Sequence, residues 1–119
     1  MGPETVSTLR IWQEGMSVVR ECYALTASWP KGELFGLTSQ VRRAAVSIPA
    51  NLAEGKGRGT ALEVARFSQI ALGSVYELDT LLQIAAEQKL NTPDQISPVR
   101  KRLANLAPQI SAYVRAKRK

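Results

Sequence analysis

Apolar side chains recur every three or four residues in four separate stretches of the chain, and this spacing places them on one face of an α-helix. The first stretch carries Leu9, Trp12, Met16, Val19 and Tyr23 in this register, and the second carries Leu34, Leu37, Val41, Ala44 and Ile48. The third continues through Val64, Phe67, Ala71, Ser74, Leu78, Leu81 and Ala85, and the fourth through Ile96, Val99, Leu103, Leu106, Ile110 and Tyr113. The pattern predicts four helices over about residues 6–28, 33–54, 60–89 and 93–116.

Short connections between these helices and the lack of an alternating strand pattern indicate an all-α fold, an antiparallel up-and-down four-helix bundle. A length of 119 residues suits one domain, which buries roughly two thirds of the surface of its unfolded chain. We expect a single bundle domain over residues 1–119 with a basic C-terminal tail over about residues 115–119.

The stretch SIPANLAEGKGRGTALE, residues 47–63, raises the question of a phosphate-binding loop. A P-loop needs GxxxxGK followed by Ser or Thr after a strand, and neither condition holds here. The glycines instead predict a corner between two helices, with Gly55 as the left-handed cap that ends the second helix. Thr60 and Glu63 match the T-x-x-E capping box at the start of the third helix.

Two further positions interrupt the helical pattern. Pro49 removes a backbone N–H inside the second helix and predicts a kink there, while Asn51 lies in the core register and needs a partner. That partner is either an orphan carbonyl of the same helix or a group on another helix or subunit. Gly73 weakens the third helix by about 1 kcal/mol, so the pair Gly73 and Ser74 predicts a close crossing by another helix.

Composition narrows the possible chemistry. The chain has no histidine, and therefore lacks the usual general base and metal ligand. A di-iron site of the bundle type needs Glu-x-x-His motifs, and the acidic pair Glu77 and Asp79 diverges around a helix. The single Cys22 fits a small buried side chain better than a reactive thiol. We expect no catalytic residues, no metal and no cofactor, and hence a protein that is not an enzyme.

The net charge is +6, and much of the excess lies after residue 99, where there is no acidic residue. Such a basic segment indicates an anionic partner, RNA or DNA first and an anionic membrane second, or else a solvated tail. Without interleaved aromatic residues, the basic side chains favour contacts to phosphates over stacking on bases. The candidate nucleic-acid-binding residues are Arg42, Arg43, Lys56, Arg58, Arg100, Lys101, Arg102, Arg115, Lys117, Arg118 and Lys119. For Arg43 and Arg58, pairing with an acid such as Glu54 is the alternative.

Two long runs carry a family resemblance: GLTSQVRRAAVSIPANLAEGKGRG and EVARFSQIALGSVYELDTLLQIA. With IWQ, CYALT, WP and ELFGL upstream, they resemble the four-helix bundle family of large-subunit rRNA intervening sequences over about residues 9–86. The resemblance implies a ring-like homopentamer with no established catalytic activity. It also implies a similarity in fold to the basic accessory proteins of diversity-generating retroelements, which work with a reverse transcriptase and nucleic acid. The chain departs from the family pattern at Leu62, and Pro108 bends its last helix.

No uncharged run approaches the roughly 20 residues that span a bilayer, and the N-terminal MGPETVSTLR lacks the features of a secretory signal. We therefore expect a cytoplasmic, homo-oligomeric protein with no membrane partner, which binds RNA or DNA through phosphate contacts. The alternative is a protein-interaction scaffold without a nucleic-acid role, whose partner could be a reverse transcriptase. Pro49, Asn51, Gly55, Thr60, Glu63, Gly73 and Ser74 are expected to serve the core or a subunit interface.

Overall fold

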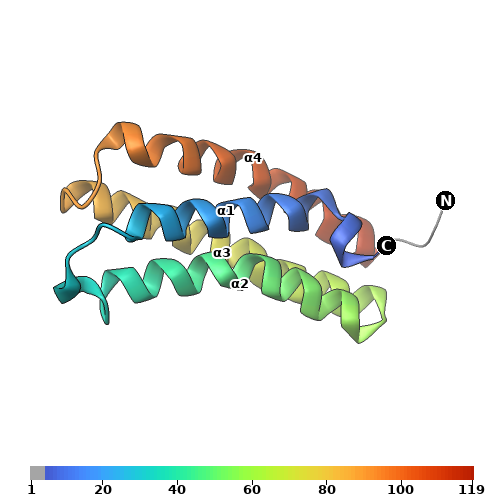
Figure 1. Ribbon diagram of the computed structural model, residues 1–119. Helices are drawn as coiled ribbons and strands as arrows, with labels where there is room; N and C mark the ends of the chain where they lie inside the picture. The colour runs from blue at the N-terminus through green and yellow to red at the C-terminus, as the bar shows by residue number, and fades with distance from the viewer. Residues whose placement is uncertain (1–4) are drawn as a thin grey trace.

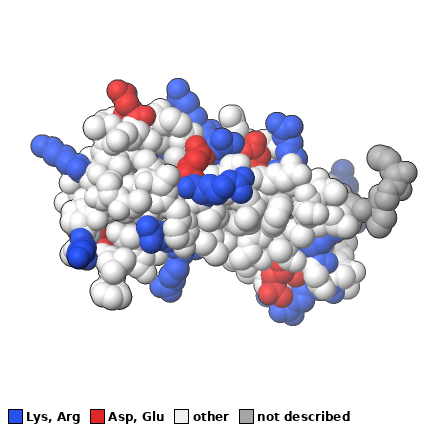
Figure 2. Space-filling view, in the orientation of Figure 1, with Lys and Arg blue, Asp and Glu red and all other residues white. Residues whose placement is uncertain are grey.

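The computed structural model describes residues 5–119; residues 1–4 of the expected domain lie outside the described part. Four helices fill this part of the chain: α1 (Arg10–Thr26), α2 (Leu37–Arg58), α3 (Ala61–Glu87) and α4 (Pro93–Arg118). Each helix packs against the next one in the chain, and α4 returns to pack against α1 (Figure 1). The bundle measures 44 × 24 × 24 Å, and its charged side chains stand on the outer surface (Figure 2). The predicted all-α, up-and-down four-helix bundle is confirmed.

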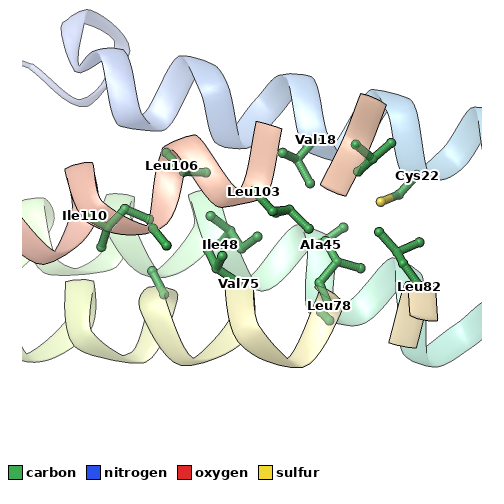
Figure 3. Close-up of a cluster of buried hydrophobic side chains, with 14 of the residues drawn as sticks. Val18, Cys22, Ala45, Ile48, Val75, Leu78, Leu82, Leu103, Leu106 and Ile110 are labelled. Carbon is green, nitrogen blue, oxygen red and sulfur yellow. The ribbon is translucent and has the colours of Figure 1, made fainter. Parts of the chain in front are cut away.

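The core runs along the bundle axis and is built from aliphatic side chains of all four helices. Ile48, Leu78 and Leu103 meet in its centre from α2, α3 and α4 (Figure 3). Along each helix the buried residues follow the three-four spacing of the sequence. Burial of one such aliphatic side chain stabilises the fold by about 1.5–3 kcal/mol. The buried faces of α2, α3 and α4 therefore agree with the predicted ones, except at Leu34, which precedes α2 and is 46% exposed.

The buried face of α1 differs from the predicted face by about one residue. Its buried members are Ile11, Gly15, Val18, Cys22 and Thr26, whereas Trp12, Met16 and Val19 are half-buried and Tyr23 is 44% exposed. The prediction followed the largest apolar side chains. The bundle instead uses small residues where α1 approaches α2, because a Cβ on Gly15 would already stand 3.3 Å from Cγ2 of Ile48.

The ends of the helices also shift. Short 3-10 turns, Val6–Thr8 and Lys31–Glu33, precede α1 and α2, so these helices begin at residues 10 and 37. The second helix was expected to end at Gly55, but α2 continues through it to Arg58 and is closed by Gly59, whose φ is 86°. Gly55 is therefore not a left-handed cap.

Gly55 has another use at the corner between α2 and α3. A Cβ at this position would stand 3.1 Å from Cα of Val64 and 3.2 Å from the carbonyl oxygen of Glu63. The backbones of α2 and α3 meet this closely only because the side chain is absent. Thr60 caps α3 as predicted, since its hydroxyl accepts a hydrogen bond from the N–H of Glu63 at 3.2 Å. The reciprocal half of the capping box is not formed, because the Glu63 carboxylate pairs with Arg66 instead.

The partner of Asn51 lies in the same chain. Its side-chain amide donates to the carbonyl and to the hydroxyl of Ser47, each at 2.8 Å. The Ser47 hydroxyl in turn lies 2.8 Å from the hydroxyl of Ser74 on α3. Pro49 is buried within a continuous α2 and faces Gly15 of α1. These polar contacts connect α2 to α3 and satisfy the amide without a second subunit.

The predicted helix crossing at Gly73 and Ser74 is correct for Ser74 and wrong for Gly73. Ser74 is buried at the contact with α2, as expected of a helix crossing. Gly73 is exposed, and nothing lies within 4 Å of a Cβ built on it. The prediction of a close crossing at Gly73 is therefore wrong for the described chain.

Among residues 5–119, no helix is long and apolar enough to cross a membrane.

Candidate nucleic-acid interface

Basic residues that are far apart in the sequence share one end of the bundle. Because α2 and α4 run in the same direction, the corner after Arg58 and the last turn of α4 both lie at the right-hand end in Figure 1. Lys and Arg side chains are visible at this end in Figure 2. We call this surface the basic end; its members are Lys56, Arg58, Arg66, Arg115, Lys117, Arg118 and Lys119. The basic side chains in the last turns of α2 and α4 also interact favourably with the dipoles of these two helices.

Arg58 and Arg66 stand on the two sides of the α2–α3 corner and share one aromatic ring. Their guanidinium carbons lie 4.9 and 4.5 Å from the ring centre of Phe67. In each arginine the Nε atom donates to a carboxylate of its own helix, to Glu54 at 3.0 Å and to Glu63 at 2.8 Å. The alternative of an Arg58–Glu54 ion pair is thus confirmed, while Arg43 makes no such pair among the described residues.

The pairing with Glu54 and Glu63 leaves much of each guanidinium accessible. The side chains of Arg58 and Arg66 are 48% and 59% exposed. Their terminal nitrogens make no hydrogen bond within residues 5–119. The hydrogen bond from Arg66 lowers the pKa of the Glu63 carboxyl, so this pair stays charged at neutral pH. Exposed ion pairs of this kind contribute little, about 0–1 kcal/mol, and an incoming phosphate can share the same arginine.

The last turn of α4 supplies the other half of the basic end. Lys117 lies 5.3 Å from the ring centre of Tyr113, and Arg115 donates to the hydroxyl of Ser111 at 2.8 Å. Arg118 and Lys119 are exposed. Since helical order continues to Arg118, most of the predicted basic tail belongs to a helix.

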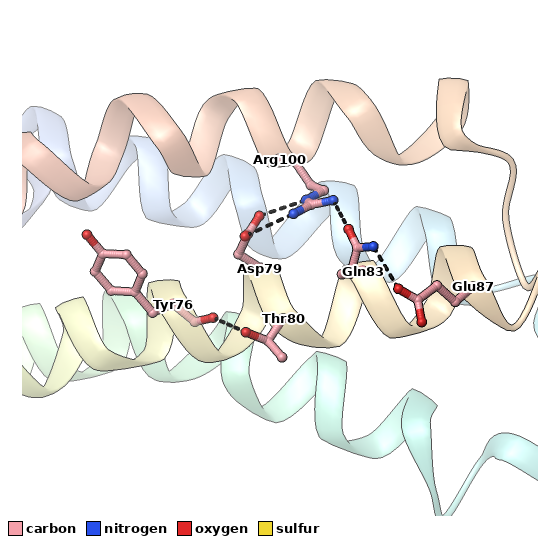
Figure 4. A network of polar contacts seen from close by, with 6 residues as sticks. All are labelled: Tyr76, Asp79, Thr80, Gln83, Glu87 and Arg100. Carbon is pink, nitrogen blue, oxygen red and sulfur yellow. Dashed lines mark hydrogen bonds and ion pairs between the residues drawn. The ribbon is translucent and has the colours of Figure 1, made fainter.

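Arg100 and Arg102 are held in a different way, by acids on other helices. Arg100 donates through Nε and one terminal nitrogen to the two oxygens of Asp79, at 2.8 and 3.1 Å, and its other terminal nitrogen donates to Gln83 (Figure 4). Arg102 donates to Glu21 at 2.6 Å and to Glu14, and so joins α4 to α1. These hydrogen bonds raise the pKa of both arginines above the ordinary value. All three guanidinium nitrogens of Arg100 and two of the three in Arg102 are engaged, so a phosphate that took over these nitrogens would break contacts between helices.

Three other candidates lie away from the basic end. Lys101 is exposed on α4. Arg42 stacks on Tyr23 at 4.5 Å and donates to Thr26 at 2.8 Å. Arg43 is exposed and lines an open groove of about 610 Å³ together with Tyr23, Leu34, Phe35, Thr38, Ser39, Arg42, Val46 and Ser47.

Cys22 and the acidic residues were the other side chains considered for chemistry. Cys22 is fully buried, and burial, with a smaller effect of Glu21, raises the pKa of its thiol to about 12. The predicted burial of Cys22 is confirmed. Within residues 5–119 there is no cluster of three or more side chains of the types His, Cys, Asp and Glu that could hold a metal ion.

Sequence reasoning missed Arg66 and Phe67 as members of the site. A local signal was present, since Glu63 and Arg66 are three residues apart and therefore neighbours on one helix face. Phe67 was assigned to the core stripe, where it is in fact half-buried. Its remaining surface is the ring over which both guanidinium groups lie.

Comparisons with known proteins bear on the family and the fold of the chain. The profile of the 23S rRNA-intervening sequence protein family matches residues 7–112. Among solved structures, a protein of unknown function from the S23 ribosomal protein family of Bacteroides thetaiotaomicron has a TM-score of 0.77 at 15% identity, over 87% of this chain and 97% of that chain. At this identity the likeness shows the fold alone. A search of curated proteins found no match.

Proposed function

Because the chain belongs to the 23S rRNA-intervening sequence protein family, we propose that it is a non-enzymatic, cytoplasmic protein that binds structured RNA through phosphate contacts at the basic end. The observation that carries this proposal is the difference between two classes of arginine. Arg58 and Arg66 keep both terminal nitrogens without a hydrogen bond within residues 5–119. Arg100 instead donates through both terminal nitrogens, to Asp79 and Gln83, and Arg102 donates through Nε and one terminal nitrogen to Glu21 and Glu14.

The character of the surface supports phosphate contacts rather than base reading. The basic end is formed by the α2–α3 corner and the last turn of α4 (Figure 1). Phosphate contacts dominate affinity for nucleic acids and carry little sequence information. We therefore expect RNA binding that depends weakly on sequence and strongly on salt.

The test compares two triple variants that remove the same amount of charge. Arg58→Gln/Lys117→Gln/Arg118→Gln neutralises part of the basic end, and Lys31→Gln/Arg43→Gln/Lys89→Gln neutralises exposed residues toward the opposite end. Binding to a fluorescein-labelled RNA hairpin is measured by anisotropy across a salt series, with DNA of the same sequence for comparison.

Each lost phosphate contact lowers the log–log salt slope by about 0.7–0.9, so the basic-end variant should lose about 2 to 3 from the slope. Its Kd should rise by at least tenfold at moderate salt, while the control variant stays within a few-fold of the wild type. Equal effects of the two variants, or no binding by the wild type at low salt, would contradict the proposal.

One observation favours the second candidate, a protein-interaction scaffold. Phe35 is 94% exposed beside Leu34 at 46% and Val46 at 41%, on the groove that contains Arg43. A cluster of exposed apolar side chains is typical of a surface that meets protein. Under this alternative, Phe35→Ser would abolish partner binding while leaving RNA affinity unchanged.

We also propose that the protein acts as a homo-oligomer, with the pentamer as the expected state. Exposed Ile70, Tyr76 and Ile84 on the outer side of α3 support a contact with further copies. Light scattering at micromolar concentration measures the state directly, and a monomer would contradict this part of the proposal.

A further inference from the structure

The α2–α3 corner holds two guanidinium groups in a fixed arrangement around one ring. Arg58 is in the last turn of α2 and Arg66 is in the second turn of α3, and the guanidinium carbon of each lies within 5 Å of the Phe67 ring centre, at 4.9 and 4.5 Å. A guanidinium stacked over an aromatic face is attracted by the ring quadrupole and loses side-chain freedom before any ligand arrives.

Each guanidinium is also fixed at a second point. Glu54 and Glu63 accept from the Nε atoms of Arg58 and Arg66, in an i,i+4 and an i,i+3 pair on their own helices. The ring and the carboxylate together fix the plane of the guanidinium but leave its terminal nitrogens without a partner in the described chain. Two terminal N–H groups in one plane are the geometry that grips a phosphate with two parallel hydrogen bonds.

The backbone beneath this arrangement is held tightly. Gly55 brings α2 against α3, with Cα of Val64 3.1 Å and Cβ of Phe67 3.0 Å from the position of a Cβ on residue 55. The hydroxyl of Thr60 accepts from the Glu63 N–H at the start of α3. The two arginines therefore project from a corner at which the backbones of α2 and α3 are in close contact.

From this geometry we propose that Phe67 is a positioning residue and that Arg58 and Arg66 form a two-arginine clamp for two neighbouring phosphodiester groups of nucleic acid. This inference rests on the proposed RNA-binding function and locates its most specific contact. Phe67 itself does not touch the phosphates; its ring holds the two guanidinium groups ready and so reduces the ordering that binding would otherwise require.

Five variants test the clamp against the same labelled RNA hairpin, and the fifth combines Phe67→Leu with Arg58→Gln/Arg66→Gln. Phe67→Leu keeps an apolar side chain but removes the ring, and Phe67→Tyr keeps the ring. Arg58→Lys/Arg66→Lys keeps the charge and loses the planar fork, while Arg58→Gln/Arg66→Gln removes the charge. Thermal denaturation followed by circular dichroism establishes that each variant is folded at the temperature of the binding measurement.

We expect Phe67→Leu and the double lysine variant to raise Kd about three- to tenfold with an unchanged salt slope, since the ionic contacts remain. Phe67→Tyr should stay within about twofold of the wild type. The double glutamine variant should lower the log–log salt slope by about 1.4 to 1.8, which corresponds to two phosphate contacts. In the double glutamine background, Phe67→Leu should have no further effect.

The outcomes separate this inference from the function on which it rests. If the double glutamine variant binds RNA as tightly as the wild type, the clamp is overturned, and the proposed RNA binding would rest on the basic residues in the last turn of α4. Phe67→Leu weakening RNA binding equally with and without the two arginines would show a merely structural ring and overturn the positioning role. Failure of the wild type to bind RNA at low salt would reject the proposed function itself.

Discussion

Gly55 and Gly73 are both helical glycines, yet the structure predicts opposite effects for their replacement by alanine. In Gly55→Ala the new Cβ would stand 3.0 Å from Cβ of Phe67, 3.1 Å from Cα of Val64 and 3.2 Å from the Glu63 carbonyl. Two of these three atoms belong to the backbone, which cannot turn aside as a flexible side chain would. Overpacking costs about 1–3 kcal/mol, and the better helix propensity of alanine offsets about 1 kcal/mol of it. Because two of the three contacts are to backbone atoms, we place the overpacking cost at the upper part of this range, about 2–3 kcal/mol, and expect a net loss of about 1–2 kcal/mol of unfolding free energy.

Gly73→Ala is the matched control, because nothing lies within 4 Å of a Cβ at this position. Only the propensity difference remains, so this variant should gain about 0.5–1 kcal/mol. For a chain of this size, 1 kcal/mol corresponds to roughly 3–5 °C in Tm. Thermal denaturation by circular dichroism should therefore order the melting temperatures Gly73→Ala, wild type, Gly55→Ala from high to low. A Gly55→Ala variant as stable as the wild type would refute the close approach of α2 and α3.

Three further predictions concern charged and titratable groups. Arg102→Gln leaves Glu14 and Glu21, 27% and 29% exposed, without their shared partner; urea denaturation should show a loss of about 1–2 kcal/mol, against less than about 0.5 for Arg115→Gln. The pKa of Cys22 is raised to about 12 by burial, so a thiol reagent at pH 8 should label the protein only after unfolding, and rapid labelling of the native state would be inconsistent with this burial. The hydrogen bond from Arg66 lowers the pKa of Glu63, so the ion pair stabilises the fold above the ordinary pKa of a glutamate, and this stability is lost as the pH falls through the lowered pKa. In Arg66→Gln, NMR titration should show a higher Glu63 pKa than in the wild type. An unchanged Glu63 pKa would exclude the pair.

The fold was predictable because three of the four helices carry long apolar residues at regular spacing. Ile48, Leu78 and Leu103 define their buried faces without ambiguity. The face of α1 was misplaced because Gly15 and Cys22, which fit the narrow space beside α2, are less conspicuous in a sequence than Trp12 and Tyr23. Size rather than hydrophobicity determines which side of α1 can pack closely.

The corner after α2 shows a second limit of sequence reasoning. Glycine suits both a left-handed cap and a close approach of two backbones, and the stretch contains Gly55, Gly57 and Gly59. Only the three-dimensional arrangement shows that Gly59 has the positive φ, at 86°, and that Gly55 faces α3. The local pattern predicted a corner but could not tell which glycine served which purpose.

The candidate site was also predictable from the sequence only in part. Clusters of basic residues were visible in the sequence, but the partners of Arg100 and Arg102 lie 21, 81 and 88 residues away in Asp79, Glu21 and Glu14. No local pattern could separate these structural arginines from Arg58, whose partner Glu54 is one turn away. The distinction between occupied and accessible guanidinium forks therefore required the packing of the helices.

The most direct test of the account follows the side-chain Nε–H signals of the arginines by NMR while RNA is added. The account predicts that the signals of Arg58, Arg66 and Arg115 shift or broaden with increasing RNA and recover when salt is raised. It predicts that the signals of Arg100 and Arg102 stay in place, since their contacts to Asp79, Glu14 and Glu21 persist. Shifts confined to Arg100, Arg102 or Arg42, with the basic end unchanged, would contradict the claim that this end of the bundle is where RNA binds.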